Sequence, residues 1–154
     1  MQTFLPYPDF RECVRVLDHR RLGKQRVEAY QILRILLGLQ SGTGWRNHPA
    51  VLMWTGYEEA LKLYHNLCIE EWVARGFKNQ MQLFACDKKP PMPPWLGNPR
   101  FHRSHQSNLL RKNPDYYRPF FRGVRSNIPY WWPTYNNCKG GFAQKKCTNA
   151  PKKR

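Results

Sequence analysis

The chain has 154 residues, 41% of them hydrophobic and 14% aromatic, so it can form one domain with a core, and a disordered chain is excluded. Its 26 Lys and Arg residues outnumber 10 acidic ones and give a net charge of +16. We therefore expect a polyanionic partner, with nucleic acid favoured over an anionic membrane surface.

The cysteines are five in number and form no CxxC pair, and no secretory signal opens the chain. This predicts a reducing, intracellular location: the cytoplasm of a prokaryote or virus-infected cell, or the nucleus in view of the basic tail. Cys138 and Cys147 could join His102 or His105 at a zinc ion, but their spacing matches no standard motif, so we expect neither metal nor cofactor. No apolar run approaches the ~20 residues that span a bilayer. We expect a monomer without membrane contact.

The helix signals predict an all-α fold: a single compact domain of three to four helices with long loops and an N-terminal arm. This domain is predicted over residues 1–135, before a basic flexible tail over residues 136–154. Residues 1–8 contain two prolines and are predicted to be an extended arm. The capping-box spacing of Asp9 and Glu12 predicts a short helix as far as about Leu17.

A second helix is predicted as far as Gly38, and a glycine-rich loop follows it. One long third helix is predicted from Pro49 to Arg75, with Gly76 as its stop. Its apolar stripe recurs at steps of three and four residues, so we interpret it as core. The stripe comprises Ala50, Trp54, Tyr57, Leu61, Tyr64, Cys68 and Trp72. Residues 100–114 predict one further short helix, which Pro114 ends.

Residues 17–28 read LDHRRLGKQRVE and place one carboxylate, Glu28, among several cations. On a helix, Lys24, Gln25 and Glu28 share a face with Arg21. The neighbouring cations are expected to lower the pKa of Glu28 and keep it ionised. Either Glu28 pairs with Arg21 or Lys24, which contributes only ~0.3–0.5 kcal/mol, or it serves a reaction that develops positive charge, such as loss of a base from deoxyribose.

Aromatic and basic residues alternate in DYYRPFF, over residues 115–121, and Trp45 lies beside Arg46 and His48. Such residues stack on bases and neutralise phosphates, but the same aromatic residues could be core. His48, His102 and His105 could transfer protons, or act as caps and hydrogen-bonding groups. The motifs GxSxG, HExxH, GxGxxG and the P-loop do not occur, which argues against the common hydrolases, zinc proteases and nucleotide enzymes.

The order of these motifs resembles the endonuclease V-type pyrimidine-dimer DNA glycosylases of phages, large viruses and bacteria. The resemblance covers about Met1 to Phe121. Its anchors are the N-terminal arm, a D-x-x-(H/R)-L segment at Asp18–Leu22, and a helix with Arg26 and Glu28. The segment NHPAVLMWTGYEEALKLYHNLCIEEWVARGF, at 47–77, is similar to the family's loop and long helix ending in RGF. PDYYRPFF is similar to its late aromatic and basic cluster.

The resemblance implies a metal-free DNA-repair glycosylase with AP-lyase activity, which excises damaged pyrimidines from double-stranded DNA, UV-induced dimers first among them. In the family the N-terminal α-amine attacks C1′ of the damaged nucleotide and forms an imine. Gln2 is bulky, so the initiator methionine is expected to stay and Met1 to be this nucleophile; α-amines, with reference pKa values of ~7.7–8.0, are partly neutral at cellular pH. The family's catalytic glutamate corresponds to Glu28.

Charge, aromatic pattern and resemblance together nominate the DNA-binding residues, although Gln2 stands where the family has arginine. They are Gln2, Arg20, Arg21, Lys24, Arg26, Arg46, His48, Arg103, His105, Arg111, Lys112, Tyr116, Tyr117 and Arg118. Two rival functions stay open at this point. One is a non-catalytic nucleic-acid-binding module, and the other is an RNA-directed enzyme that uses His48, His102 and His105 as acid and base.

Overall fold

The computed structural model describes residues 1–41 and 44–133, which form six helices and no strand. The helices are α1 (Phe10–Val16), α2 (His19–Leu36), α3 (Pro49–Leu52), α4 (Glu58–Ala74), α5 (Pro99–Lys112) and α6 (Pro114–Tyr117). The predicted all-α class is confirmed. Within the described ranges, no helix is both long and apolar enough to span a bilayer. The boundary and tail predicted around residue 135 lie outside these ranges.

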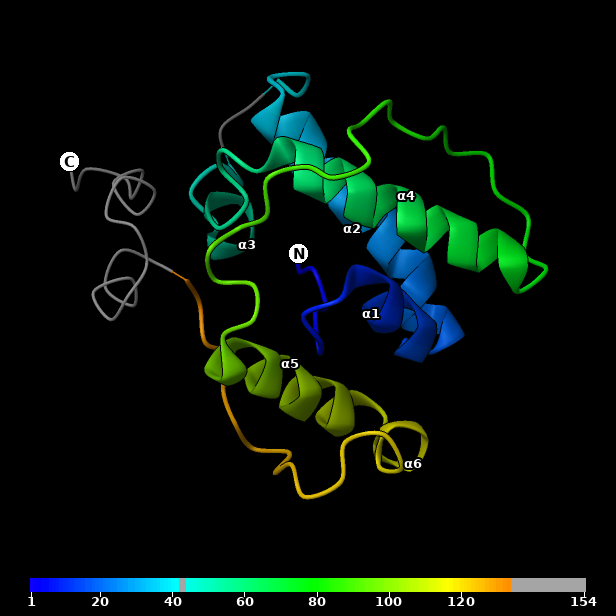
Figure 1. Ribbon diagram of the computed structural model, residues 1–154, viewed down its shortest axis with the longest axis vertical. Coiled ribbons are helices and arrows are strands. Elements are labelled where there is room, and N and C mark those ends of the chain that lie inside the picture. Colours follow the sequence, from blue (N-terminus) through cyan, green and yellow to red (C-terminus); the bar gives the residue numbers. More distant parts are fainter. Residues whose placement is uncertain (42–43, 134–154) are drawn as a thin grey trace.

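The two longest helices, α2 and α4, pack against each other and form the main body of the molecule (Figure 1). Gly23 permits their close approach, since a Cβ atom there would lie 3.1 Å from two ring carbons of Trp72. Leu22, Ala29 and Leu33 of α2 are fully buried. The opposite face of α2 is therefore left for polar side chains.

The prediction of one long third helix is wrong in one respect, because the chain forms two helices over this range. The chain leaves the helical path after α3 and starts α4 at Glu58. Gly56 has φ +83° in the intervening turn, a conformation that glycine adopts without the steric cost other residues bear. The apolar stripe is nevertheless core, since all its members are buried except Trp72, which is partly buried and packs against the core. The predicted stop is confirmed by Arg75 at the C-cap and Gly76 at φ +88°.

Residues 1–6 form the predicted extended arm, and most of it is buried between the helices. Side chains provide hydrogen-bond partners for its peptide groups. The N–H of Phe4 donates to Gln25 Oε1 (2.8 Å), and the N–H of Leu5 donates to His105 Nδ1 (3.0 Å). His102 Nδ1 lies 2.7 Å from the Leu5 carbonyl oxygen. Because buried peptide groups without partners are costly, these bonds fix the position of the N-terminus.

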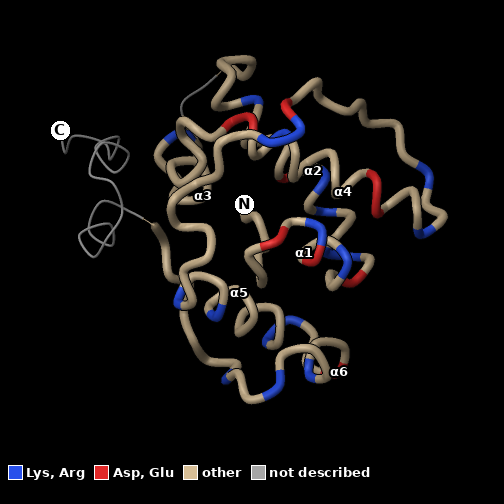
Figure 2. The backbone as a smooth tube through the Cα atoms, viewed as in Figure 1, with Lys and Arg blue, Asp and Glu red and all other residues tan. Residues whose placement is uncertain are grey.

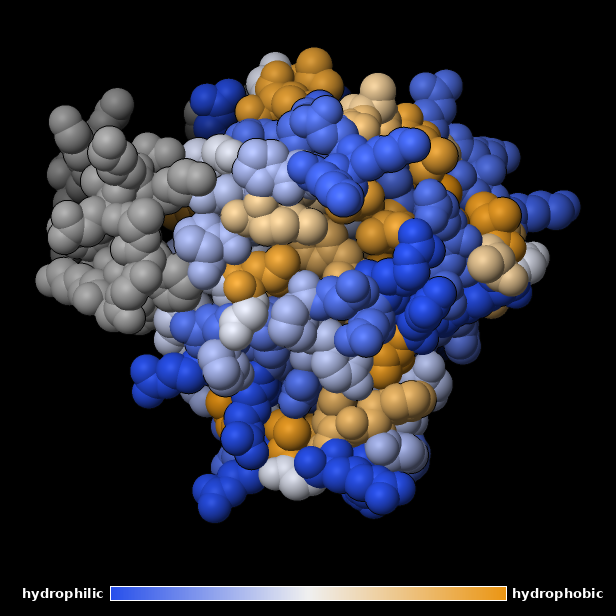
Figure 3. Space-filling model, in the orientation of Figure 1, coloured by the Kyte–Doolittle hydropathy of each residue, from blue (hydrophilic) through white to orange (hydrophobic). Residues whose placement is uncertain are grey.

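Helices α5 and α6 form the other side of the molecule, across the arm from α2 and α4 (Figure 1). Helix α5 confirms the prediction for residues 100–114, and Asn98 caps it. The single-turn helix α6 was not predicted. Basic positions occur on both sides of the molecule (Figure 2), and hydrophilic side chains cover much of the face that contains the N-terminus (Figure 3).

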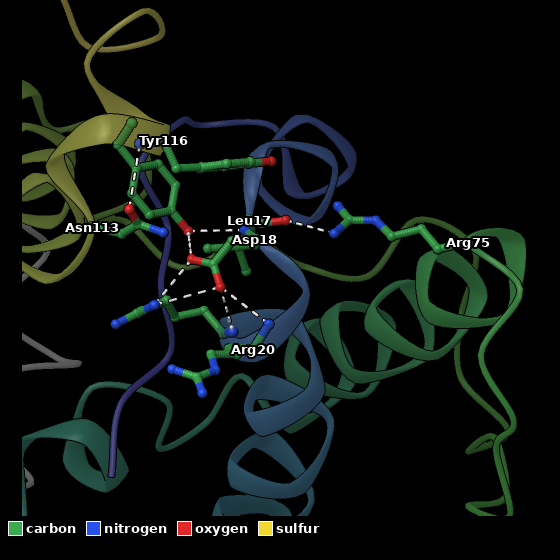
Figure 4. Close-up of polar contacts among 8 residues, drawn as sticks. Leu17, Asp18, Arg20, Arg75, Asn113 and Tyr116 are labelled. Atoms are coloured by element: carbon green, nitrogen blue, oxygen red, sulfur yellow. Dashed lines mark hydrogen bonds and ion pairs between the residues drawn. The ribbon is translucent and has the colours of Figure 1, made fainter.

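Helix α2 is tied to α6 at its first turn through Asp18, its N-cap (Figure 4). Asp18 Oδ1 accepts from the N–H groups of Arg20 and Arg21 (3.0 and 3.1 Å), and Oδ2 accepts from the Tyr117 hydroxyl (2.6 Å). Burial by itself raises the pKa of Asp18, but the hydrogen bonds from Tyr117 and Arg21 outweigh it, so the pKa lies below its ordinary value. The start of α2 therefore depends on a residue 99 positions later.

Tyr117→Phe is expected to lower the free energy of unfolding by roughly 1.5–3 kcal/mol at neutral pH, the range for a bond to a charged group. Because the pKa of Asp18 is lowered in the folded state, its stabilising effect is present above the ordinary carboxyl pKa and lost as pH falls through the folded one. The deficit of the variant should shrink over that acidic range in urea titrations. Tyr116→Phe, on a half-exposed side chain, is the control and should be neutral.

Candidate active site

A basic cavity of about 580 Å³ lies beside the N-terminus. The arm provides Met1, and the polar face of α2 provides Arg20, Arg21, Lys24 and Glu28. The arm also provides Gln2 and Phe4, and three other parts of the chain provide the remaining lining residues: His48, Lys112, and Tyr130 with Trp132. Glu28 is the only carboxylate that lines the cavity in the part of the chain described, and it faces four Lys and Arg side chains and the α-amine.

Met1 and Glu28 also line a second, smaller cavity of about 230 Å³, with Gln31, Gln40 and Trp45. Met1 and Glu28 thus border both cavities. They interact electrostatically, since the N-terminal charge acts to lower the pKa of Glu28. No salt bridge joins them among the described residues, so neither group is neutralised by direct pairing with the other.

The pKa of Glu28 is raised, contrary to the expectation from its cationic neighbours. Burial is the largest effect and raises the pKa, while the N-terminal charge, Lys24, the backbone of Gln2 and Lys112 lower it. Desolvation outweighs these attractions because burial disfavours the charged form of the carboxyl group. Glu28 therefore holds a proton to higher pH than an ordinary glutamate, a property common among catalytic carboxylates.

Gln25 connects Glu28 to the arm and is completely buried. Its Nε2 donates to Glu28 Oε2 (3.0 Å) and to the Gln2 carbonyl oxygen (2.9 Å). Its Oε1 accepts from the Phe4 N–H (2.8 Å) and the Tyr64 hydroxyl (2.7 Å). One amide therefore sets both the direction of the carboxylate and the path of the residues that carry the α-amine.

His48 contributes to the cavity wall and caps α3, where its Nδ1 accepts from the Ala50 N–H (3.1 Å). Burial and the N-terminal charge lower its pKa, so the imidazole is neutral at neutral pH. Its ring lies between Trp45, with centroids 5.4 Å apart, and Trp132, 5.9 Å apart. Tyr130 completes this aromatic side of the cavity, and burial raises its pKa to about 12.

The structure brings together most of the predicted site residues on α2 and the arm. Met1, Gln2, Arg20, Arg21, Lys24, Glu28, His48 and Lys112 all line the basic cavity. Arg111 and Arg118 line a different cavity, and Arg46, Arg103 and Tyr116 are exposed. Arg26 instead stacks on Trp72, at 4.2 Å from the ring centre, and bonds Asn79 Oδ1 (2.7 Å).

The predicted DNA contacts of His105 and Tyr117 need correction, because both side chains are fully buried and cannot contact DNA in this conformation. His105 holds the arm and Tyr117 holds the start of α2. Burial lowers the pKa of His105 to about 3, so the ring stays neutral and can accept a hydrogen bond. His102 also bonds backbone on both ring nitrogens. These roles remove the support for an RNA-directed enzyme that uses these two histidines.

Gln25, Tyr130 and Trp132 were not predicted as site residues. The i, i+3 spacing of Gln25 and Glu28 on the polar face of α2 was a usable signal for the first. The two aromatic residues carried none, because their segment reaches the cavity only through tertiary packing. No group of three or more His, Cys, Asp or Glu that could hold a metal occurs in the described ranges, which exclude Cys138 and Cys147.

A protein-family model described as pyrimidine dimer DNA glycosylase matches residues 1–85. The chain belongs to this family. Its substrate is therefore DNA. Comparison with curated proteins and with solved structures gave no match. The matched range contains the arm, α2 and His48, whereas Lys112, Tyr130 and Trp132 lie beyond it.

Glu28→Gln is expected to melt at the same temperature as the wild type or higher at pH 7. The folded state raises the pKa of Glu28, so the ionised side chain costs folding free energy at neutral pH. The advantage of the variant should be absent below the ordinary pKa of ~4.3, grow as pH rises through the folded pKa, and then stay constant. Glu70→Gln, on an exposed side chain, is the control. A variant several degrees less stable than wild type at pH 7 would contradict the burial argument.

Gln25→Met is expected to destabilise the fold by about 2–4 kcal/mol, because it leaves buried groups of Gln2, Phe4 and Tyr64 with fewer partners. Gln31→Met, on an exposed position of the same helix, should change stability by less than about 0.5 kcal/mol. Denaturant unfolding of both variants measures the difference. Equal stability of the two variants would show that Gln25 does not hold the arm.

Proposed function

We propose that the protein excises pyrimidine dimers from duplex DNA with the α-amine of Met1 as nucleophile and Glu28 as acid and base, and then cleaves the strand as an AP lyase. The observation that carries the proposal is that Met1 and Glu28 line the same two cavities, within electrostatic reach of each other. Membership of the glycosylase family supports the excision step.

In the proposed reaction the amine nitrogen forms a bond to C1′ as the N-glycosidic bond breaks, and the departing base takes the bonding electrons. The amine loses protons, and an imine to the opened sugar results. Glu28 stabilises the positive charge that develops on the sugar and shuttles protons between the amine and the sugar oxygen. Its raised pKa suits the proton transfers, because the carboxyl group gains and loses a proton more readily near cellular pH.

The cations of the cavity have a separate role in the proposal. Arg20, Lys24 and Lys112 bind phosphates on either side of the lesion, since they line the cavity and form no salt bridge within the described ranges. Arg21 is already engaged with Asp18 (3.2 Å) and orders the start of α2. The aromatic side, formed by Trp45, Tyr130 and Trp132, stacks on a base that leaves the helix.

Borohydride reduction tests the proposal, because it converts an imine into a stable covalent adduct. The chain with its native N-terminus should be trapped on a duplex that contains a cyclobutane pyrimidine dimer, and the adduct should map to Met1 by mass spectrometry. Glu28→Gln should reduce trapping by about 10²-fold or more. A chain with extra residues before Met1 should not be trapped.

Two amines of the same cavity are rival nucleophiles, so Lys24→Arg and Lys112→Arg are the matched controls. Both variants keep the positive charge and should still be trapped. Loss of the adduct in either variant, or its persistence when the N-terminus is extended, would overturn the assignment to Met1. Tight, salt-sensitive binding without any adduct would identify a non-catalytic binding module instead.

A further inference from the structure

A third cavity, of about 970 Å³, is lined by residues of the α5 end, α6 and the following segment, all beyond the part of the chain that the family model matches. Four arginines line it: Arg111 at the end of α5, Arg118 after α6, and Arg122 and Arg125 in the following segment. No acidic side chain lines this cavity in the described part of the chain. Figure 2 shows basic positions following one another along α5, α6 and this segment, and Figure 3 shows hydrophilic side chains projecting from this end of the molecule.

Arg111 has a structural role in this cavity. Its guanidinium donates to the carbonyl oxygens of Ser126 (2.8 Å) and Ile128 (3.1 Å) and to Asn108 Oδ1 (3.0 Å). The Ile128 N–H in turn donates to Ser107 Oγ (2.9 Å). Helix α5 thus holds the segment that carries Arg122 and Arg125 in a fixed position.

The other three arginines are not committed to protein partners. Arg118, Arg122 and Arg125 are exposed, and within the described ranges none forms a salt bridge or a side-chain hydrogen bond. Like charges gathered on a fixed scaffold repel one another, so the arrangement becomes favourable when an anion binds. A guanidinium group presents paired donors that match the oxygens of a phosphate.

We propose that this arginine cavity is a second DNA-binding site, which holds backbone phosphates of the duplex outside the lesion. Consecutive residues at the end of α5 line the two cavities, Arg111 the arginine cavity and Lys112 the basic cavity. A strand can therefore pass from one to the other along the end of α5. The choice of DNA as the ligand rests on the proposed function, whereas the preference for phosphate rests on the arginines themselves.

The test compares the wild type with the triple variant Arg118→Gln, Arg122→Gln and Arg125→Gln. Binding to a long duplex with a central dimer is measured at several salt concentrations. Each lost phosphate contact should reduce the slope of log K against log salt by about 0.9, so the triple variant should lose about 2 to 3 units of slope.

The control is Lys78→Gln, Lys88→Gln and Lys89→Gln, which removes the same charge from exposed positions between α4 and α5. It should retain the wild-type slope, and both triple variants should keep the wild-type melting temperature. Equal losses of slope in the two variants would mean that net charge alone is responsible and would overturn the proposal. An unchanged slope in the arginine variant would do the same, as would a loss seen with duplex RNA but not with DNA.

Failure of this inference is distinguishable from failure of the proposed chemistry. A wild type that is never trapped, but whose salt slope falls in the arginine variant, refutes the nucleophile and supports the arginine cavity. A wild type that is trapped at Met1, with the same slope in both proteins, supports the nucleophile and refutes the arginine cavity.

Discussion

The rest of the structure depends on one constraint: an extended arm is buried among helices, and no strand lies beside it in the part of the chain that the structure describes. Its peptide groups need partners, and side chains supply them from three helices: Gln25 from α2, Tyr64 from α4, and His102 and His105 from α5. The polar groups lose their contact with water when they are buried. This loss is offset only if each hydrogen bond has good geometry. In return, the first residue of the chain, usually the most mobile, has a defined position. The basic cavity is the space that this position creates beside α2.

The raised pKa of Glu28 also follows from the burial of the arm. Because the arm covers α2, it takes Glu28 partly out of water and at the same time brings the positive α-amine near it. The first effect raises the pKa of the carboxyl group and the second lowers it, and burial is the larger. A carboxylate on an exposed helix face with the same neighbours would have only the second effect. Stability is thus lower at neutral pH than it would be without the charge, which is a common cost of a reactive group.

The sequence predicted those features that local signals determine. The arm, the start of α1 at Asp9, the stop at Gly76 and the polar face around Glu28 follow from prolines, caps and helical spacing. The break at Gly56 was missed because the apolar stripe keeps its step through the turn, so burial alone does not reveal it. His105 and Tyr117 were taken for DNA contacts because their partners, Leu5 and Asp18, are 100 and 99 positions away. The same reason hid Tyr130 and Trp132, which tertiary packing alone brings to the cavity.

The bonds between the arm and α5 also bear on what constitutes an autonomous folding unit. The family model ends at residue 85, yet the peptide groups of Leu5 and Pro6 find their partners in His102, His105 and Gln106. The start of α2 is held in the same way, because the Tyr117 hydroxyl donates to Asp18. Within the range that the family model matches, the arm and the start of α2 therefore depend on hydrogen-bond partners that lie beyond residue 85. Helix α5 must keep side chains that can bond the backbone of the arm. A backbone needs these partners whichever residues the arm carries.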